Sequence, residues 1–392
     1  MQQEQALKGV AKAARPPAGS TEEGRIASID VLRGLVMVLM ALDHTRDFFG
    51  LGGFNPRDVG EPALFLTRWI THLCASTFVF LAGLSAFLYG RGRTTENLSR
   101  FLLTRGIWLM LIDLTVIKFG WGFDLDFFCV GAGVIFVIGA SMIALAALVW
   151  LPRWMIVAGA SVMIVGHNLL DGVRAEAFGQ VAWIWHFLHE PGKVTFGEGA
   201  EIYVLYPLIP WVGVMAAGYA LGPIMQRAPE KRQWFLFQLG AAITLGFVLL
   251  RASNFYGDPD PWTTQQTWVS TVLSFLNCEK YPPSLLYLMM TLGPALILLA
   301  AFEHARGAFT QGLAIFGQVP SFFYVIHIYL IHALAVLTGF ALSGAFEANP
   351  DLGFGLPSVY LVWLFALALL YPICRWFADL KRRGSSWWWP YL

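Results

Sequence analysis

The sequence predicts an all-α, polytopic membrane protein with about ten transmembrane helices, and three observations support this fold class. The 392 residues are 57% hydrophobic and only 13% charged, with 16 Trp and 31 Phe, which is too apolar for a soluble globular protein. Hydrophobic runs long enough to cross a bilayer recur along the chain. Lys and Arg concentrate in alternate connections, as cytoplasmic loops require. We therefore expect a helix bundle that is embedded in the lipid bilayer and has the bilayer as a partner.

The expected spans are long apolar runs separated by polar connections. The ten runs lie near 29–49, 67–89, 101–120, 128–150, 154–170, 202–225, 234–251, 284–302, 312–343 and 356–378. The ninth run is longer than one span and contains Gly317 and Pro320, so we expect a short helix before a span that starts at the proline. Residues 1–24 lack an apolar core and are expected to form a disordered cytoplasmic tail, which leaves 25–392 as one membrane domain.

The distribution of charge orients these spans. With the N-terminus inside, the inner segments hold about twice as many Lys and Arg residues as the outer ones. Both termini are therefore predicted to be cytoplasmic, and the long connections 50–66, 171–200 and 252–283 to lie outside. Within them, 181–190 and 266–278 are typical of short interfacial helices. The 26 Lys and Arg nearly balance the 25 Asp and Glu, so no nucleic-acid partner is expected.

A charged stripe runs through the first span, SIDVLRGLVMVLMALDHTRDFF. His44 follows Arg33 by eleven positions, which places both on nearly the same face of a helix and roughly 16 Å apart along its axis. The stripe consists of Asp30, Arg33, Met37, Met40, His44 and Asp47. Ionisable groups are costly at membrane depth, so such a stripe indicates function.

His44 is a candidate general base, because an imidazole titrates near neutral pH. An acidic neighbour, Asp43 beside it or Asp47 one turn away, would orient the ring and stabilise its protonated form. The alternative is a histidine at a helix end that bonds interfacial water or a carbonyl group. Arg33, with Asp30, is a candidate for binding an anionic group such as a nucleotide phosphate from the cytoplasm. The alternative is an ion pair that holds the helix at the interface.

Other polar residues gather at the predicted outer ends of the spans and suggest an outward-facing vestibule. His72 is a second candidate for a catalytic or substrate-binding role, against simple packing, and its position would let it meet His44. Asp43, Asp124, Asp126 and Tyr281 are candidate substrate ligands.

Two histidines lie deeper, in the ninth run. His327 and His332 are expected to hydrogen-bond between helices, with the lining of a tunnel as the alternative. No metal is expected, since HxxxH and HExxH spacings are missing from the sequence and its four cysteines are scattered.

Several separated motifs resemble a known family. IASIDVLRGLVMVLMALDHTRDFF and RWITHLCASTFVFLAGLSAFL resemble the start of the heparan-alpha-glucosaminide N-acetyltransferase catalytic-domain family of bacterial membrane proteins. The similarity continues through YPLIPWVGVMAAGYALG, KYPPSLLYLMMTLGPAL and GQVPSFFYVIHIYLIHALA, and so extends over 25–392. The first span is also similar to the Arg-x10-His pattern of acyltransferase family three, with Arg33 and His44 in those places.

The resemblance implies a transmembrane acyltransferase of the bacterial inner membrane. Acetyl-CoA would dock from the cytoplasm, with Arg33 and Asp30 at its phosphates or pantetheine, and an envelope glycan or glycolipid would receive the acetyl group outside. His44 would act as the base or carry the acetyl group, with Asp47 orienting it. The animal enzyme's catalytic histidine corresponds to the loop 50–66, which has no His here, so His44 or His72 must take that role.

Three further possibilities stay open at this point. The same intramembrane charges would suit a transporter or flippase for a polar lipid or small solute. A non-catalytic membrane subunit would tolerate loss of His44 and Arg33. A homodimer is also considered.

Overall fold

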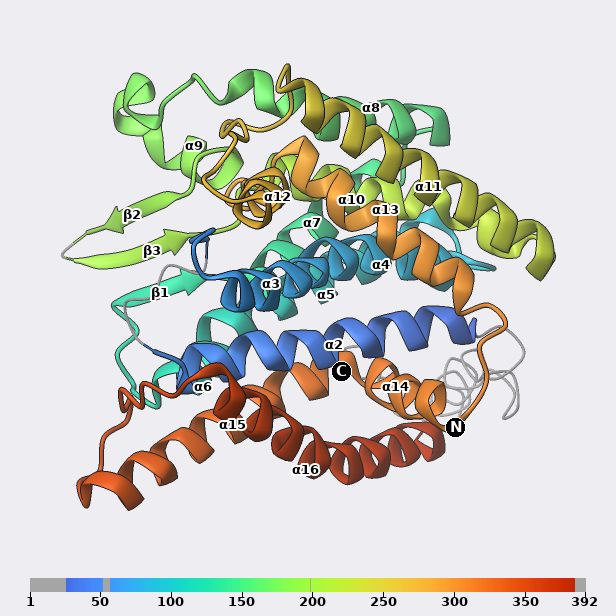
Figure 1. Ribbon diagram of the computed structural model, residues 1–392. Helices are drawn as coiled ribbons and strands as arrows, with labels where there is room; N and C mark the ends of the chain where they lie inside the picture. The colour runs from blue at the N-terminus through green and yellow to red at the C-terminus, as the bar shows by residue number, and fades with distance from the viewer. Residues whose placement is uncertain (1–25, 52–56, 198, 385–392) are drawn as a thin grey trace.

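The computed structural model describes residues 26–51, 57–197 and 199–384, and the predicted tail 1–24 lies outside them. The described chain is mostly helical (Figure 1). The α-helices are α2 (Ala27–Phe49), α3 (Pro62–Thr71), α4 (Leu73–Gly90), α5 (Thr95–Ile112), α6 (Lys118–Gly122), α7 (Val134–Leu148), α8 (Arg153–Gly166), α9 (Ala182–Leu188), α10 (Leu208–Leu221), α11 (Pro229–Ser253), α12 (Trp268–Leu276), α13 (Leu285–Ala301), α14 (Ala308–Gln318), α15 (Pro320–Ser343) and α16 (Leu356–Arg383).

Each of the ten expected runs contains a helix, and within the described part of the chain six helical segments are long and apolar enough to cross a membrane. These are Pro62–Gly90, Arg153–Leu170, Leu208–Gln226, Pro229–Ser253, Pro320–Ser343 and Leu356–Arg383. Helices α7 and α13 are apolar but shorter. Helices α2 and α5 are interrupted by charged side chains, which is why composition alone does not place them with the six.

The described residues are mostly helical, as the expected all-α fold requires, but they also include a small sheet that the sequence did not predict. Strand β3 (Ala200–Val204) pairs in parallel with β1 (Cys129–Ala132) and antiparallel with β2 (Gly192–Phe196). The runs expected from 128 and 202 therefore begin as strands, and their helices start later, at Val134 and Leu208. A short apolar run looks alike in a strand and in a buried helix, so hydrophobicity could not separate them.

Helix α2 lies between two groups of helices and contributes to both of their cores (Figure 1). Ile29 and Leu32 pack into a core formed mainly by α4, α5, α7, α10 and α13. From Val36 to Phe49 the buried side of α2 packs instead against α15 and α16. The stripe residues Met37 and Met40 are buried in this second core. The charged stripe therefore runs through the interior.

Glycines allow two close helix crossings. Gly83 of α4 and Gly218 of α10 each face the other helix's backbone so closely that a Cβ atom would overlap a carbonyl oxygen. Gly34 of α2 and Gly317 of α14 form a matching pair. In a membrane the hydrophobic effect does not drive helices together, because the lipid is also apolar. Small residues at such crossings let the two backbones approach closely and pack instead.

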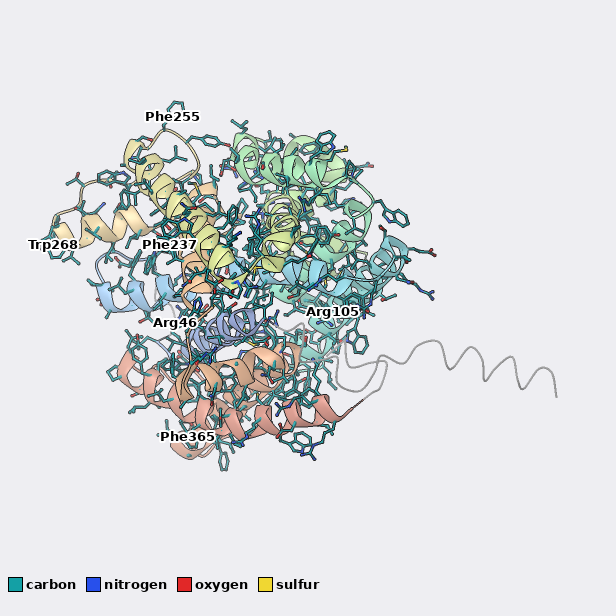
Figure 2. All side chains as sticks on the ribbon, turned by 90° about the vertical axis from the view of Figure 1, so that its right-hand side faces the viewer. Arg46, Arg105, Phe237, Phe255, Trp268 and Phe365 are labelled. Carbon is teal, nitrogen blue, oxygen red and sulfur yellow. The ribbon has the colours of Figure 1, made fainter. Side chains whose placement is uncertain are left out.

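The predicted outer connections gather at one end of the bundle, where α9, α12 and the sheet lie (Figure 1). The short helices expected at 181–190 and 266–278 are confirmed as α9 and α12, and α14 precedes a span that starts at Pro320, as expected. Figure 2 shows Phe255 and Trp268 at the rim, where they are 87% and 78% exposed. Arg46 lies among the helices instead, with its side chain only 10% exposed.

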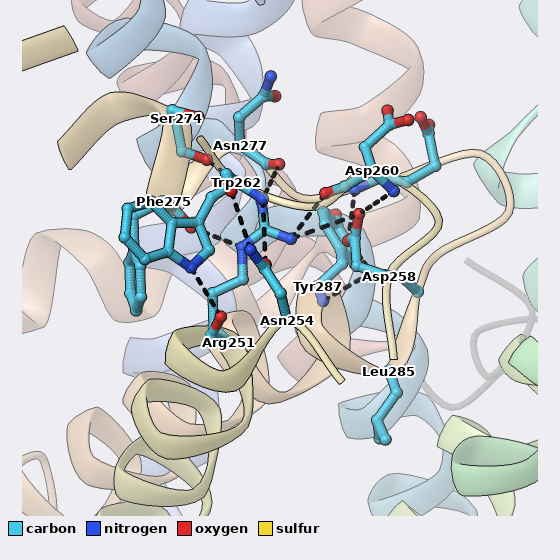
Figure 3. Close-up of polar contacts among 12 residues, drawn as sticks. Arg251, Asn254, Asp258, Asp260, Trp262, Ser274, Phe275, Asn277, Leu285 and Tyr287 are labelled. Carbon is cyan, nitrogen blue, oxygen red and sulfur yellow. Dashed lines mark hydrogen bonds and ion pairs between the residues drawn. The ribbon is translucent and has the colours of Figure 1, made fainter. Parts of the chain in front are cut away.

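One buried arginine holds the longest of these connections in place (Figure 3). Arg251, 1% exposed at the end of α11, pairs with Asp258 at 3.6 Å. Its guanidinium also donates to the carbonyl oxygens of four residues, Asp260, Ser274, Phe275 and Asn277. Ser284, which caps α13, donates to Asp258 at 2.6 Å. This network fixes the segment 279–284 against the end of the bundle.

Candidate functional site

Arg33 lies near the start of α2 and ties three helices together. Its Nη1 is 3.3 Å from Asp30 Oδ1 and donates to the carbonyl oxygen of Gly317 at 3.1 Å. Its Nη2 donates to Ser85 Oγ of α4 at 2.7 Å. The ion pair between Asp30 and Arg33, which is the alternative to anion binding, is therefore present. The guanidinium is 16% exposed, so an anion reaching it would compete with Ser85 and Gly317 for its donors.

At the other end of the stripe, His44 forms a hydrogen bond with a second histidine. His44 Nδ1 lies 2.7 Å from His327 Nε2 of α15, and His327 Nδ1 lies 2.9 Å from the carbonyl oxygen of Phe323. A carbonyl oxygen only accepts, so His327 Nδ1 carries a proton. In the neutral pair His327 Nε2 is then an acceptor, and His44 Nδ1 donates to it. This leaves the lone pair of His44 Nε2 available to receive a proton.

Aromatic rings form the wall around this pair. Trp121 of α6 meets the His44 ring edge-on with centroids 4.9 Å apart, and Tyr324 does so at 6.1 Å. Phe48 stacks on Trp121. His44 itself is half-buried. The imidazole is thus fixed in orientation while keeping contact with the outside.

The carboxylates beside His44 are engaged elsewhere. Arg46 Nη2 lies 2.8 Å from Asp47 Oδ1 and 2.9 Å from Asp43 Oδ1. The Asp47 side chain is 41% exposed. His327 therefore takes the place at His44 Nδ1 that the sequence assigned to Asp47. Arg46 directly precedes Asp47 in α2 and lies one turn from Asp43, and its single guanidinium group holds both carboxylates.

His72 follows the end of α3 and is 6% exposed. Its ring meets Tyr287 edge-on with centroids 5.4 Å apart, and Tyr287 donates its hydroxyl to the His72 carbonyl at 2.8 Å. Within the described residues neither ring nitrogen has a hydrogen-bond partner. No hydrogen bond or ring contact joins His72 to His44 in this part of the chain.

The remaining predicted substrate ligands lie on two separate features. Asp124 binds Lys118 at 2.6 Å, and the hydrogen bond from Lys118 holds the pKa of Asp124 below its usual value. The carboxylates of Asp124 and Asp126 also accept backbone N–H groups in their own turn. The Tyr281 hydroxyl lies 3.4 Å from that of Tyr206. The two aspartates thus shape a turn, whereas Tyr281 faces the bundle.

His332, like His327, confirms the expectation of hydrogen bonding between helices. Its Nδ1 lies 2.8 Å from the carbonyl oxygen of Gly120 in α6, and its Nε2 faces that of Ala348. Phe48 and Phe123 stack on its ring. His332 therefore supports the wall that holds Trp121.

Sequence reasoning missed Arg68 and Lys280 as members of the outer polar site. Both act electrostatically on His72 and Asp43. Arg68 precedes His72 by one helical turn, a spacing visible in the sequence, whereas Lys280 arrives from a distant connection that only the fold places there.

No metal site is found among the described residues. No group of three or more His, Cys, Asp or Glu side chains in this part of the chain is placed to hold a metal ion. The four cysteines are free. A small pocket of about 220 Å³ opens beside the C-terminal end of α2. It is lined by Asp47, Phe48, Gly50, Asn349, Pro350, Asp351 and Leu352.

Residues 25–253 match the model of a protein family described as heparan-alpha-glucosaminide N-acetyltransferase, catalytic. The match covers more than half of the chain and includes Arg33, His44 and His72. The curated proteins contain no significant match to this sequence.

Proposed function

Because the chain belongs to the heparan-alpha-glucosaminide N-acetyltransferase catalytic family, which makes it a membrane acetyltransferase, we propose the direction and the acceptor of the transfer. Acetyl-CoA binds from the cytoplasm, and the acetyl group passes to an amine or hydroxyl of a glycan or glycolipid on the outer side of the bacterial inner membrane. One observation carries this proposal: a single buried helix presents an arginine at one end and a histidine with a free Nε2 near the other.

Arg33 is proposed to bind the donor. Its guanidinium already donates to a hydroxyl and a carbonyl oxygen, both weaker acceptors than a phosphate. An incoming phosphate would take over these donors, while Asp30 keeps the side chain aligned. The pantetheine arm would then extend along the stripe toward His44.

His44 is proposed to activate the acceptor. As the acceptor nitrogen or oxygen forms a bond to the thioester carbonyl carbon, His44 Nε2 takes the proton from that atom. The C–S bond breaks, and the CoA thiolate leaves and receives a proton in turn. An alternative route begins with attack by Nε2 itself, which gives an acetyl-histidine that the acceptor then cleaves. His327 stabilises the reactive tautomer in both routes.

The other predicted residues have supporting roles in this proposal. His72 is the second candidate for the base. Asp43 and Asp47 hold Arg46, and Tyr281 contacts the acceptor from the outer connection. Asp124 and Asp126 form the outer turn next to α6, where they would face a long acceptor rather than its reacting group.

Calorimetric titration of the detergent-solubilised protein with acetyl-CoA tests the donor side. We expect micromolar binding by the wild type and by His44→Ala, and much weaker binding by Arg33→Ala. Transfer of radiolabelled acetyl to amino sugars should be lost in His44→Ala. A well-folded wild-type protein that does not bind acetyl-CoA would overturn the proposal in favour of a transporter or flippase.

A further inference from the structure

Buried polar atoms without partners are concentrated at one place in this molecule. Among the described residues, ten buried side-chain nitrogen and oxygen atoms have no hydrogen-bond partner, and five of them belong to four residues. These atoms are Asp43 Oδ1, Arg46 Nη1, Arg68 Nε and both ring nitrogens of His72. Leaving such groups unsatisfied is costly, so a cluster of them indicates a missing ligand.

The four residues are neighbours at the outer end of the bundle. Arg46 Nη2 lies 2.9 Å from Asp43 Oδ1, outside the geometry of a hydrogen bond. The charges of Arg68 and Lys280 act on both Asp43 and His72. Lys280 is 7% exposed and lies over the Tyr281 ring at 5.0 Å. Three elements thus meet here: the end of α2, the end of α3 and the segment before α13.

The charges at this place do not cancel. Asp43 and Asp47 both bind Arg46, which leaves neither of them paired with another cation. Arg68 and Lys280 form no ion pair with any described carboxylate. Three cations therefore face two anions. Buried cationic charge is retained at a cost, and an incoming anion removes that cost.

We propose that Arg46, Arg68, His72 and Lys280, here called the oxyanion cluster, bind a phosphate or carboxylate group of the acceptor. Arg46 Nη1, Arg68 Nε and one His72 ring N–H are the unused donors, and Lys280 adds a point charge. Buried water would satisfy the donors but not the excess charge. The ligand class is therefore an acidic sugar or a sugar phosphate rather than a neutral saccharide.

This inference rests on the proposed function, because it names the class of acceptor that the same site receives. Asp43 directly precedes His44 in α2, and the charges of Lys280 and Arg46 act on His44. An acceptor held by its anionic group in the oxyanion cluster would thus have its amine or hydroxyl beside His44. The assignment also gives His72 a binding role instead of a catalytic one.

Titration of the detergent-solubilised full chain with three sugars tests the cluster without any acetyl-CoA. Glucuronate and glucosamine 6-phosphate should bind, and glucosamine should bind at least about tenfold more weakly than its phosphate. Comparison of the two anions separates a carboxylate from a phosphate source. Arg68→Gln and Lys280→Gln should each weaken binding of the preferred anion by about tenfold or more.

Arg174→Gln is the matched control, because Arg174 lies in another outer connection and pairs with Glu190 only at the exposed surface. It should bind the anion as the wild type does. Unfolding temperatures confirm that each variant is folded, and Arg68→Lys replaces Arg68→Gln where the latter fails to fold. Equal affinity of the wild type for neutral and anionic sugars, or anion binding unchanged in both folded variants, would overturn the inference.

The two proposals fail separately. Anion binding without any acetyl transfer by the wild type would refute the proposed acceptor chemistry and keep the oxyanion cluster. His44→Ala should bind the anion normally but lose transfer, which would support both.

Discussion

His44 and His327 are 283 residues apart in the chain and share one hydrogen bond of 2.7 Å between Nδ1 and Nε2. Because the Phe323 carbonyl fixes the proton on His327 Nδ1, the pair has a single neutral arrangement with His44 Nε2 unprotonated. Helix α15 therefore sets the protonation pattern of a side chain on α2. The reactive group of the proposed site thus depends on contact between two distant parts of the sequence.

We predict that His327→Phe lowers the rate of acetyl transfer by about tenfold to a thousandfold, because His44 then loses the acceptor that selects its tautomer. Binding of acetyl-CoA should be unchanged. Single-turnover transfer together with calorimetric titration measures both. His304→Ala removes an exposed histidine and serves as the control. A His327→Phe variant with full transfer would show that the tautomer is set in another way.

Arg33→Ala should weaken acetyl-CoA binding and also lower the unfolding temperature. The substitution removes the ion pair with buried Asp30 and the hydrogen bonds to Ser85 and Gly317, each contributing about 0.5–3 kcal/mol. Arg33→Lys separates the two effects, since it keeps the charge and loses the fork of donors. A loss of stability with unchanged acetyl-CoA affinity would show that Arg33 does not bind the donor and only joins α2, α4 and α14.

Gly83→Ala should destabilise the protein by about 1–3 kcal/mol, because the new methyl group would overlap the Met215 carbonyl oxygen and push α4 away from α10. Gly159→Ala in α8 is the matched control, since its Cβ would meet no atom within 4 Å. Unfolding of both variants in the same detergent measures the difference. Equal stability of the two would mean that the crossing adjusts without cost.

Arg251→Gln should strongly destabilise the connection between α11 and α13. Removal of the guanidinium leaves buried Asp258 and four carbonyl groups without their donor, and breaking a buried pair in this way costs about 3–5 kcal/mol. Limited proteolysis between residues 254 and 284 should become faster. Anion binding should weaken as well, because this connection carries Lys280. A protease-resistant variant with unchanged anion affinity would contradict the prediction.

Binding of glucuronate should not change between about pH 7 and 9. Burial by itself lowers the pKa of Lys280, but Tyr281 and the charge of Asp43 outweigh it, and the pKa is raised from its ordinary value of 10.5. A raised pKa of a cation means that its charge and its stabilising effect are complete below 10.5 and are lost only as the pH rises through the folded-state value. Titration at several pH values measures this. A decline already below pH 9 would indicate that Lys280 is not the cation involved.

The parts of this site that depend on local spacing could be predicted from the sequence. Spacing alone placed Asp30, Arg33 and His44 on one helix face, and the structure confirms the ion pair between the first two. The span that starts at Pro320 also follows from local chemistry.

What escaped prediction depends on partners that are distant in sequence. His327 and Lys280 reach the site only through the packing of α15 and the course of the connection after α11. Without an alignment or a structure, a histidine such as His327 looks the same whether it binds water, a carbonyl group or a second histidine. Asp47 likewise has two possible partners nearby in α2, Arg46 and His44. It pairs with Arg46, whose longer side chain reaches its carboxylate.

Helix α2 contributes to two cores at once, so neither group of helices can move away from α2 without losing part of its core packing. Rocking one group against the other, as alternating access demands, would pull Ile29 and Leu32 away from one set of neighbours or Met37 and Met40 from the other. We therefore expect a static scaffold during turnover. In the proposed transfer, the moving part would then be the substrate, whose thioester would pass along a stationary helix to a fixed His44.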